Sequence, residues 1–537
     1  MSLTVGYMIN ASFKFCALIL VVETLLPALV GSAPQVSSEG LVQTSMQAVS
    51  EACVIMPTEP VKPFADSDDP ITISGHFHEV DWKSLVGKLV TIKGDMKIVD
   101  THNLARYGEV RVARERLHVP TSRLDPNDAD PDGVSFEGGS NVAKVVAAQK
   151  RNDKAVLTLD DGRNSQNVFP PKLFPKLGDT QPTVRLGSII KGVSGRVVEK
   201  RNTIYLIPSE PLKWVPAERP ARPSVGDADI TVASFNVLNY FTTIDNGSNN
   251  ARGADSKSEF TRQDAKIVSA IIALKADVIG LMEIENKRGA EQRLVAALNK
   301  ASGKDIFKGC GIPVGFRKAP GGGDAIRVAL IYRADRVSTV GGVTMIRDTA
   351  FSAARTPVVQ TFRSEQGGEP FTVVVNHFKS KGGARDANAA NKNKGDGQGA
   401  HNATRRSQAL AIVKYVDGLT KGDPRVLILG DLNAYQQEDP IDALRAGGLV
   451  DLVSTRQPSG EQGPHYSYVY YGQCGSLDHA MANTSLAKDI TGVATWHINA
   501  DEPRFLDYNE ENNPRPLFKP DPFRSSDHDP VLIGIRK

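Results

Sequence analysis

Apolar residues are arranged differently in two long regions of the chain. Between residues 71 and 207 they form short β-branched runs separated by Gly, Asp, Asn and Pro, a pattern typical of a small all-β barrel or sandwich. The expected strands are 71–77, 89–98, 109–113, 155–159, 189–198 and 203–207. From residue 228 to residue 537, strongly apolar runs alternate with segments of helical periodicity, which predicts an α/β domain.

The α/β region opens with a strand, a helix and a second strand. Residues 230–235 and 278–282 have the continuous apolar pattern of buried strands, and residues 261–274 place their apolar side chains on one helical face. Thr261 is the expected N-cap of that helix, with Asp264 three residues later. Later strands are expected at 328–332, 371–376, 426–429, 477–482 and 531–535, and a second helix at about 404–419.

Proline marks the boundary between the two regions. The stretch 208–227 contains Pro208, Pro211, Pro216, Pro220 and Pro223. Because proline fixes φ and lacks an amide hydrogen, this stretch cannot run as a helix or as a central strand. We therefore expect a semi-rigid linker here.

The first 33 residues have the pattern of a secretory signal. Lys14 precedes an apolar run over residues 15–30, and small residues then lead to Ala33, although Glu23 interrupts the run. A membrane anchor is the alternative, but the run is shorter than the ~20 residues needed to span a bilayer. Residues 34–70 are rich in Ser, Pro, Asp and Glu and predict a flexible lead-in. We expect a secreted protein, with the periplasm as a second location and no stable membrane insertion.

Composition excludes few classes of function. The chain has 537 residues, 40% hydrophobic and 23% charged, which suits folded, soluble material with more than one core. Its net charge of +3 is too small to diagnose a nucleic-acid-binding protein. The sequence contains no P-loop, no G-x-G-x-x-G after a strand and no G-x-S-x-G elbow, which argues against nucleoside triphosphate, dinucleotide and α/β-hydrolase chemistry.

Polar side chains stand where the apolar runs of the second region end or begin. These positions are Asn236, Glu283, His377, Asp431, Asn433, Asp478, Asp527 and His528. A strand that ends at a site and a strand that starts there can lie antiparallel, so all of these positions can share one edge of a β-structure. That arrangement is the geometry of an active site.

Spacing within these motifs favours metal-assisted hydrolysis. Asp431 and Asn433 are two residues apart, so an extended backbone points both to the same side. Asp527 and His528 combine a hard oxygen ligand with an imidazole that exchanges protons, and a carboxylate such as Asp478 can fix a histidine tautomer. Taken singly, the aspartates and Asn433 are also explained as turn or capping residues, and a lone histidine such as His377 is also explained as a structural residue.

The segment that follows His377 is the most basic loop of the chain. Residues 378–406 contain seven Lys or Arg and two Asp, among many Gly and Asn. Such a segment suits contact with a phosphate backbone, and a solvated flexible loop is the alternative. Cys310 and Cys474 are candidates for a disulfide, with free buried thiols as the equal alternative.

Six motifs along the chain resemble, in the same order, those of the endonuclease/exonuclease/phosphatase superfamily, the group of DNase I and the abasic-site endonucleases. They are FNVLN, LMEIEN, VVNHFKSKG, LILGDLNAY, SLDHAMAN and SSDHDPVL. The segments RGAD, EFTRQDAKIVSAI, NKGDGQGAHNATRRSQA and YSYVYYGQCGSLDHA are closer to secreted bacterial extracellular nucleases. The resemblance covers about 230–537 and implies a four-layered α/β sandwich, two packed β-sheets flanked by helices. The segments MKIVDTHNLARYGEVRVA and LTLDDG are similar to the OB-fold-like domain that precedes the nuclease in such enzymes. Such a domain would either bind single-stranded nucleic acid in a groove near Tyr107 or act only as a spacer.

The resemblance also implies roles for the site residues. Glu283 would bind the metal, with Asn236 and Asp527 close to it. Asp431 and Asn433 would position and activate the attacking water.

Further residues would act on the phosphate or on the transferred proton. His528 would be the general base or charge stabiliser, oriented by Asp478, and His377 would bind the phosphate or assist the leaving oxygen. The residues expected to contact substrate phosphates are Arg355, Lys379, Lys381 and Arg405.

These observations together predict a monomeric, secreted nuclease that cleaves DNA or RNA, without a protein partner. Mg²⁺ is the expected metal, and Ca²⁺ and Mn²⁺ fit the same oxygen ligands. Two alternatives remain open: a phosphoesterase that acts on a phospholipid or small phosphate ester, and a non-catalytic nucleic-acid-binding surface protein. Endonuclease and exonuclease action are equally compatible with the sequence.

Overall fold

The computed structural model describes residues 69–130, 133–181, 183–383, 385, 387–419, 424–456, 465–511 and 517–537. The predicted signal segment 1–33 and all but the last two residues of the 34–70 lead-in lie outside the described residues. Residues 69–537 group together as one unit by their internal contacts. No helix among the described residues is long and apolar enough to cross a membrane.

The N-terminal region forms one seven-stranded sheet. Its strands are β1 (Ile71–Ile73), β2 (Leu89–Asp100), β3 (Val110–Ala113), β5 (Leu157–Leu159), β6 (Ile189–Lys200), β7 (Thr203–Pro208) and β8 (Trp214–Val215). Strand β2 pairs with both β3 and β6, so the order β2-β3-β5-β7-β6 closes on itself. Gly94 and Gly192 both have positive φ where the β2–β6 register shifts, which bends the long strands around the enclosed core. Val90, Ile92, Met96 and Ile98 of β2 are fully buried in that core.

Two features of this region correct the sequence prediction. The region is not all-β, because helix α3 (Val142–Lys154) lies between β3 and β5. Only Val145 of α3 is buried, so the helix has no apolar stripe that the pattern could reveal, and its Ala, Lys and Gln residues form it by propensity. The predicted linker 208–227 contains strand β8, which pairs with the edge of β6, a place where flanking prolines are tolerated. Short helical turns complete the region: η1 (Phe77–Glu79), η2 (Trp82–Leu85), α2 (Leu104–Tyr107) and η3 (Pro120–Ser122).

Two six-stranded sheets form the centre of the C-terminal region. The first has the order β11 (Phe307–Gly309), β12 (Ile326–Arg333), β10 (Val278–Glu285), β9 (Ile230–Tyr240), β22 (Val531–Ile535) and β21 (Ile490–Thr495). The second has the order β13 (Val337–Met345), β14 (Val358–Ser364), β15 (Phe371–His377), β16 (Arg425–Asp431), β20 (Asp478–Ala482) and β17 (Val450–Asp451).

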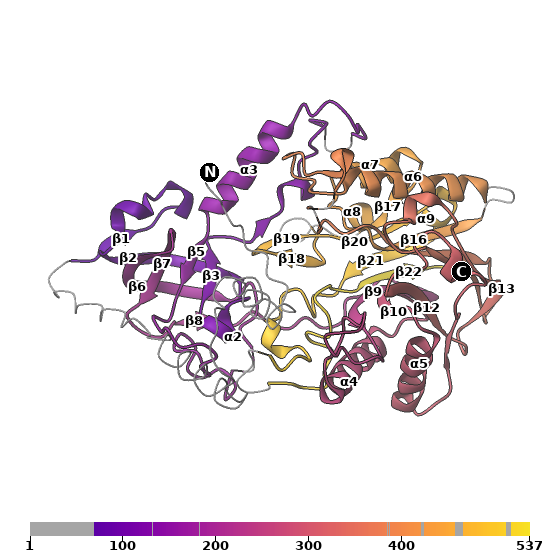
Figure 1. Cartoon of the computed structure of the whole chain (residues 1–537), viewed down its shortest axis with the longest axis horizontal. Coiled ribbons are helices and arrows are strands. Elements are labelled where there is room, and N and C mark those ends of the chain that lie inside the picture. Colours follow the sequence, from indigo (N-terminus) through magenta and orange to yellow (C-terminus); the bar gives the residue numbers. More distant parts are fainter. Residues whose placement is uncertain are drawn as a thin grey trace, which may run out of the picture. The chain divides into compact units, whose positions relative to one another are not determined.

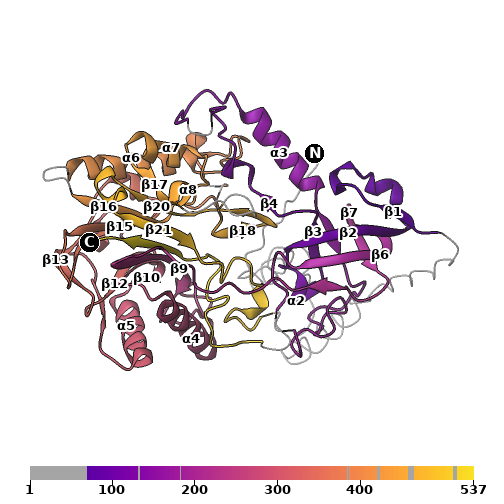
Figure 2. The ribbon, with the colours of Figure 1, turned by 180° about the vertical axis from the view of Figure 1, so that it is seen from behind.

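Helices cover the outer faces of both sheets (Figure 1 and Figure 2). Helices α4 (Lys257–Leu274) and α5 (Arg288–Ser302) pack on the first sheet, and α6 (Asn402–Gly418) and α7 (Asp439–Ala446) pack on the second. Between the sheets lies a separate core that receives side chains from both. The region is therefore a mixed α/β fold with four layers. The remaining elements are η4 (Phe316–Lys318), η5 (Thr349–Phe351), η7 (Ala389–Asn391), α8 (Leu452–Arg456), α9 (Thr484–Ala487) and η8 (Arg504–Leu506).

The two sheets approach each other very closely at Gly280 of β10. A Cβ atom at this position would lie 2.4 Å from Leu429 Cδ1 on β16, so a larger residue would force the sheets apart. Helix α4 begins earlier than predicted, because Ser256 and not Thr261 is its N-cap. Ser256 Oγ accepts a hydrogen bond from the Glu259 amide (3.1 Å), whereas the Thr261 hydroxyl donates to the Lys257 carbonyl inside the helix.

A small three-stranded sheet joins distant parts of the sequence. Strand β4 (Leu117–His118) pairs in parallel with β19 (Gln473–Gly475), which pairs in antiparallel with β18 (Tyr468–Tyr470). The Val119 amide continues this contact by donating to the Cys474 carbonyl (2.9 Å).

Candidate active site

The ends of five strands, three on the second sheet and two on the first, bring predicted site residues together. On the second sheet, Asp431 of β16 is in register with His377 of β15 and with Asp478 of β20. On the first sheet, Asn236 of β9 is in register with Met282, the residue before Glu283. The predicted convergence of these positions at one edge is therefore observed in the structure.

Glu283 is displaced from the regular strand by a bulge. The register of β10 shifts between Met282 and Ile284, and Glu283 itself has a φ of 63°. Its Oε2 accepts a hydrogen bond from the Asn239 amide (3.1 Å). Burial raises the pKa of Glu283, and the nearby negative charge of Asp527 raises it further. The chain therefore holds a carboxylate in an unusual backbone position beside another acid.

Asp431 is the most contacted acid of the site. Asn236 Nδ2 donates to its Oδ2 (3.3 Å), and the Asn433 amide donates to its Oδ1 (2.9 Å). Asn433 has a φ of 51°, a conformation that Asn adopts more readily than most residues. Burial raises the pKa of Asp431 to about 7, with Asp478 adding to the effect and His528 opposing it.

His528 is held by a buried carboxylate. Its Nδ1 lies 2.7 Å from Asp478 Oδ2, and the Ser467 hydroxyl donates to the same oxygen (2.6 Å). The other ring nitrogen, Nε2, lies 3.9 Å from Asp431 Oδ2. Burial alone would lower the pKa of His528, but Asp478 and Asp431 outweigh it and raise that pKa well above its usual value. The Tyr468 ring packs on the imidazole with centroids 4.6 Å apart.

His377 lies on the opposite side of Asp431 and has the opposite electrostatic surroundings. Its Nε2 is 3.4 Å from Asp431 Oδ2 and 3.9 Å from Glu283 Oε1. Burial lowers the pKa of His377 well below its usual value, and the positive charge of Arg355 adds to the effect. His377 is therefore neutral near neutral pH, whereas His528 is charged.

Positive charge borders the site on the side of His377. The Arg355 guanidinium is buried and donates to the Phe378 carbonyl (3.1 Å), and its charge acts on Glu283 and Asp431. Burial lowers the pKa of the half-buried Lys379, and Arg355 lowers it further. Arg252 also lies close to the site, because its positive charge lowers the pKa of both His377 and Arg355. It was not among the residues predicted from the sequence. Arg252 belongs to the RGAD segment, whose likeness to extracellular nucleases could have indicated it. Ser467 and Tyr468 were also not predicted, although they lie in the similar segment YSYVYY.

Lys381 and Arg405, which were predicted to contact substrate phosphates, both make contacts within the protein. Lys381 Nζ pairs with Glu438 and donates to the Gln398 carbonyl (2.7 Å). The Arg405 side chain is fully buried and donates to the carbonyls of Ala400 (2.7 Å) and Gln398 (2.9 Å). Lys381 thereby joins the basic loop to Glu438 at the start of α7, and Arg405 joins α6 to carbonyls of the same loop.

The proposed disulfide is not present, because Cys310 and Cys474 are both free. Cys310 packs against the core between the two large sheets. Cys474 lies on β19, where Arg116 Nη2 contacts its sulfur (3.1 Å). Burial raises the pKa of both thiols, so neither is a reactive thiolate at neutral pH.

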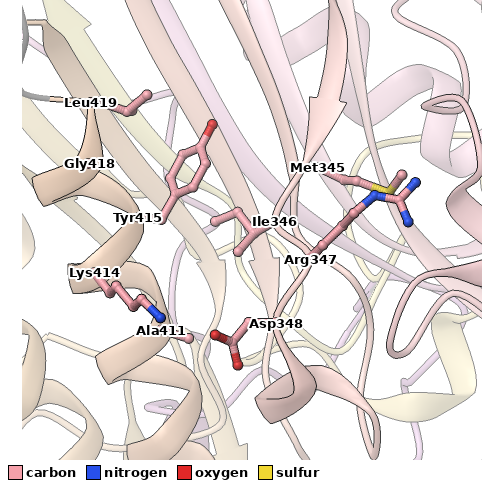
Figure 3. Close-up of a pocket in the computed structure, with 9 residues that line it drawn as sticks. All are labelled: Met345, Ile346, Arg347, Asp348, Ala411, Lys414, Tyr415, Gly418 and Leu419. Atoms are coloured by element: carbon pink, nitrogen blue, oxygen red, sulfur yellow. The ribbon is translucent and has the colours of Figure 1, made fainter.

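A surface pocket of about 360 Å³ lies away from the site. Lys414 and Tyr415 of α6 line one side, and Arg347 and Asp348 line the other (Figure 3). None of the predicted site residues contributes to it.

Sequence comparison agrees with the arrangement of the site. The profile of the Endonuclease/Exonuclease/phosphatase family matches residues 233–528, a segment that begins in β9 and ends at His528. The chain belongs to the endonuclease/exonuclease/phosphatase family. Enzymes of this family are generally hydrolytic phosphoesterases that use divalent metals, and they include nucleases, phosphatases and DNA-repair enzymes.

Several solved structures are similar to this chain. The human Nocturnin catalytic domain with bound sulfate has 17% identity and a TM-score of 0.37, over 59% of this chain and 98% of its own. The mannosyl-6-phosphatase Bt3783 of Bacteroides thetaiotaomicron VPI-5482 has 16% identity and a TM-score of 0.37, over 57% and 100%. D. rerio TDP2 complexed with single-strand DNA product has 14% identity and a TM-score of 0.36, over 57% and 99%. No curated protein matches the chain.

The residues at the strand ends fit the divalent metal that family enzymes use. Glu283 and Asp431 are carboxylates in buried surroundings, and the pKa of each is raised by burial and by a neighbouring acid. A hard cation bound between such oxygens would relieve this repulsion. A separate acidic cluster among the described residues, Asp255, Glu259 and Glu511, has ligand atoms within 4.8 Å of one another. It lies outside the predicted site.

Proposed function

We propose that the chain is a secreted nuclease that hydrolyses phosphodiester bonds of extracellular DNA or RNA with the help of a divalent metal. The observation that carries this proposal is the His528 imidazole, held by Asp478 at 2.7 Å with its free nitrogen 3.9 Å from Asp431. An acid that faces an oriented imidazole across a short gap is an arrangement for moving protons during hydrolysis. Secretion is supported by the signal-like pattern of residues 1–33.

The metal would be held on the Glu283 side of this gap. Glu283 would bind Mg²⁺, Ca²⁺ or Mn²⁺, with Asn236 and Asp527 beside it. The bound ion would act as a Lewis acid that polarises the phosphodiester. The oxygens of these three residues are of the type that such hard ions prefer.

The chain's own residues would orient the attacking water and accept its proton. Asp431 would accept a hydrogen bond from the water and then its proton, while Asn433 fixes the direction of attack. His528 Nε2 would donate to a phosphate oxygen, and the Asp478 carboxylate keeps the imidazole in the required orientation. Attack in line with the leaving oxygen is the geometry that phosphoryl transfer requires.

Residues on the other side of Asp431 would bind the phosphate. The neutral His377 can donate one hydrogen bond to a phosphate oxygen, whereas Arg355 and Lys379 contribute positive charge. A polymeric substrate is favoured because these residues place positive charge beside the site. Arg252, which is half exposed, lies next to them and is paired with Asp324 (3.4 Å).

The N-terminal barrel is proposed to be OB-like. Its closed circuit of β2, β3, β5, β7 and β6 has one parallel pair, β5–β7, and antiparallel pairs elsewhere. This is a five-stranded barrel of the kind that often binds nucleic acid.

One assay separates this proposal from its alternatives. Purified protein is incubated with plasmid DNA, linear DNA, RNA, sphingomyelin and inositol phosphates, each with Mg²⁺ or with EDTA. We expect cleavage of nucleic acid that EDTA abolishes and that the Asp431→Ala, His528→Ala double variant loses. The matched control is Val314→Ala, since Val314 is 94% exposed and should retain full activity. Hydrolysis of only the small phosphate esters, or equal cleavage by the double variant, would overturn the proposal.

A further inference from the structure

A tyrosine-rich hairpin leads from His528 to the protein surface. Strands β18 and β19 form this hairpin, and Tyr468 at its base packs on the His528 ring. Tyr470 is 47% exposed and Tyr471 is 65% exposed, and their rings contact each other edge to face with centroids 4.6 Å apart. Two adjacent, exposed aromatic side chains therefore stand at the end of a strand that begins at the site.

The alternation of side chains along β18 fixes which way these rings face. Val469 packs against the core of the barrel, so Tyr468 and Tyr470, one residue before and after it, share the opposite face. The ring of Tyr435 packs against Gly475 of the neighbouring strand β19. The contact is so close that a Cβ atom at Gly475 would lie 2.4 Å from the ring. Lys381 Nζ lies 5.0 Å from the centre of that ring. The face is thus aromatic, and the Lys381 cation beside it is paired with Glu438.

Tyr471 occupies a backbone position that is unfavourable for tyrosine. Tyr471 and Gly472 are the two residues of the hairpin turn, with φ of 48° and 79°, and turns of this kind favour Asn-Gly. Arg111 of β3 donates from Nη1 to the Tyr471 carbonyl (3.0 Å), so the barrel holds the turn in place. The chain therefore keeps an exposed ring at a position where neither backbone preference nor burial explains it.

We propose that Tyr470 and Tyr471 form a stacking platform for the unpaired bases of a single-stranded nucleic acid. This inference rests on the proposed nuclease function and names the form of substrate that the site takes. Bases of a single strand have free faces, which stack on aromatic rings without regard to sequence. The hairpin then guides the attached phosphates along β18 towards His528.

The test measures binding with and without bases on the same backbone. Labelled oligothymidylate of about 12 nucleotides, within the site size of such platforms, is compared with an abasic deoxyribose phosphate chain of equal length. Binding to the full chain is measured in EDTA, which prevents hydrolysis. We expect the parent to bind oligothymidylate more tightly than the abasic chain, since stacking of one base changes affinity by a factor of about 5 to 150.

Variants then assign this difference to the hairpin. Tyr470→Ala and Tyr471→Asn should each lower affinity for oligothymidylate by at least about fivefold, without changing affinity for the abasic chain. Tyr470→Phe and Tyr471→Phe keep the rings and should bind like the parent, as should the Val314→Ala control. Tyr471→Asn also relieves the turn, so its melting temperature should equal or exceed that of the parent. This variant separates lost stacking from lost folding.

Two results would overturn the inference. One is equal affinity of the parent protein for oligothymidylate and for the abasic polymer. The other is an equal fall in affinity for both ligands in the Tyr471→Asn variant. Cleavage of plasmid DNA by the parent, measured separately, tests the proposed function alone. A parent that cleaves nucleic acid but does not distinguish the two chains would retain that function and lose the platform.

Discussion

At the scale of single residues, the contact between Asp478 and His528 determines what the imidazole can do. Asp478 accepts hydrogen bonds from both Ser467 and His528 at the same oxygen, so two partners hold its carboxylate in place. The charge of His528 and its orientation both depend on this acceptor.

We expect Asp478→Asn to lower kcat on nucleic acid by about 10²- to 10⁴-fold, the range for loss of an oriented proton-transfer group. The amide has nearly the same shape but cannot stabilise a positively charged imidazole. Steady-state kinetics with plasmid DNA would measure the effect. Ser467→Ala is the control, since it removes a neighbouring hydrogen bond and leaves the carboxylate, and it should reduce kcat much less. Equal kinetics for Asp478→Asn and the parent would contradict the assigned role.

Two lysines of the basic loop are expected to respond differently to the same substitution. Lys381→Met leaves the fully buried Glu438 without its cation and should destabilise the fold by about 3 kcal/mol. Lys379→Met removes a charge beside Arg355 and should instead weaken substrate binding with little change in stability. Urea unfolding and KM on an oligonucleotide measure the two effects. The reverse pattern would restore Lys381 as a substrate ligand.

At the scale of elements, the sequence pattern located most of the strands and two long helices. The apolar runs at 230–235, 278–282, 371–376 and 426–429 all lie within observed strands, because buried strands must be apolar on both faces. The prediction missed α3, whose side chains are mostly exposed, and β13, whose residues 338–342 are all exposed. It also missed α5 and β14, although both have buried side chains. Where burial does not select the side chains, hydrophobic periodicity carries no signal.

The N-cap of α4 is a measurable case of a boundary that the pattern misplaced. Ser256→Ala removes the hydrogen bond to the Glu259 amide and should cost about 1 kcal/mol of unfolding free energy. Thr261→Ala, inside the helix, should be neutral or slightly stabilising, since alanine has the higher helix propensity. Thermal unfolding of the two variants compares them directly. A larger loss for Thr261→Ala would support the original prediction.

The residues of the candidate site and their convergence at the strand ends were predictable, but the contacts of the loop cations were not. Strand-end polar residues identified Asn236, Glu283, Asp431 and Asp478, because their positions follow from where each apolar run stops. Burial of Arg405 and its carbonyl contacts depend on tertiary packing, so its charge and position in the sequence do not reveal them.

At the scale of the whole molecule, a buried ionic cluster joins the barrel to the C-terminal region. Arg116 and Arg185 from the N-terminal region pair with Asp501 (2.6 and 3.2 Å). Arg185 also pairs with Glu502 (2.7 Å), and the Tyr466 hydroxyl donates to Asp501 (2.8 Å). Residues adjacent to the site are thus fixed by cations from more than 300 positions earlier in the sequence.

Stability should therefore fall in acid through Asp501. Burial alone would raise the pKa of Asp501, but Arg116 and Arg185 outweigh it and lower that pKa to about 2. A lowered carboxyl pKa stabilises the fold above the unfolded value of ~3.9, by about 2 kcal/mol, and this stabilisation is lost as pH falls from about 4 to 2. Chemical unfolding across this range should show a shallower pH dependence for Asp501→Asn than for the parent. Identical slopes would contradict the assignment.

The pairing of β4 with β19 also has a consequence for the order of folding. Arg116 and Cys474, at the ends of this contact, are 358 residues apart, and contacts of such long sequence separation form late because they close large loops. Strand β18, which carries Tyr468 over His528, belongs to the same small sheet. We therefore expect the recovery of activity during refolding to lag behind the recovery of secondary structure, so that a partly synthesised or partly refolded chain is inactive.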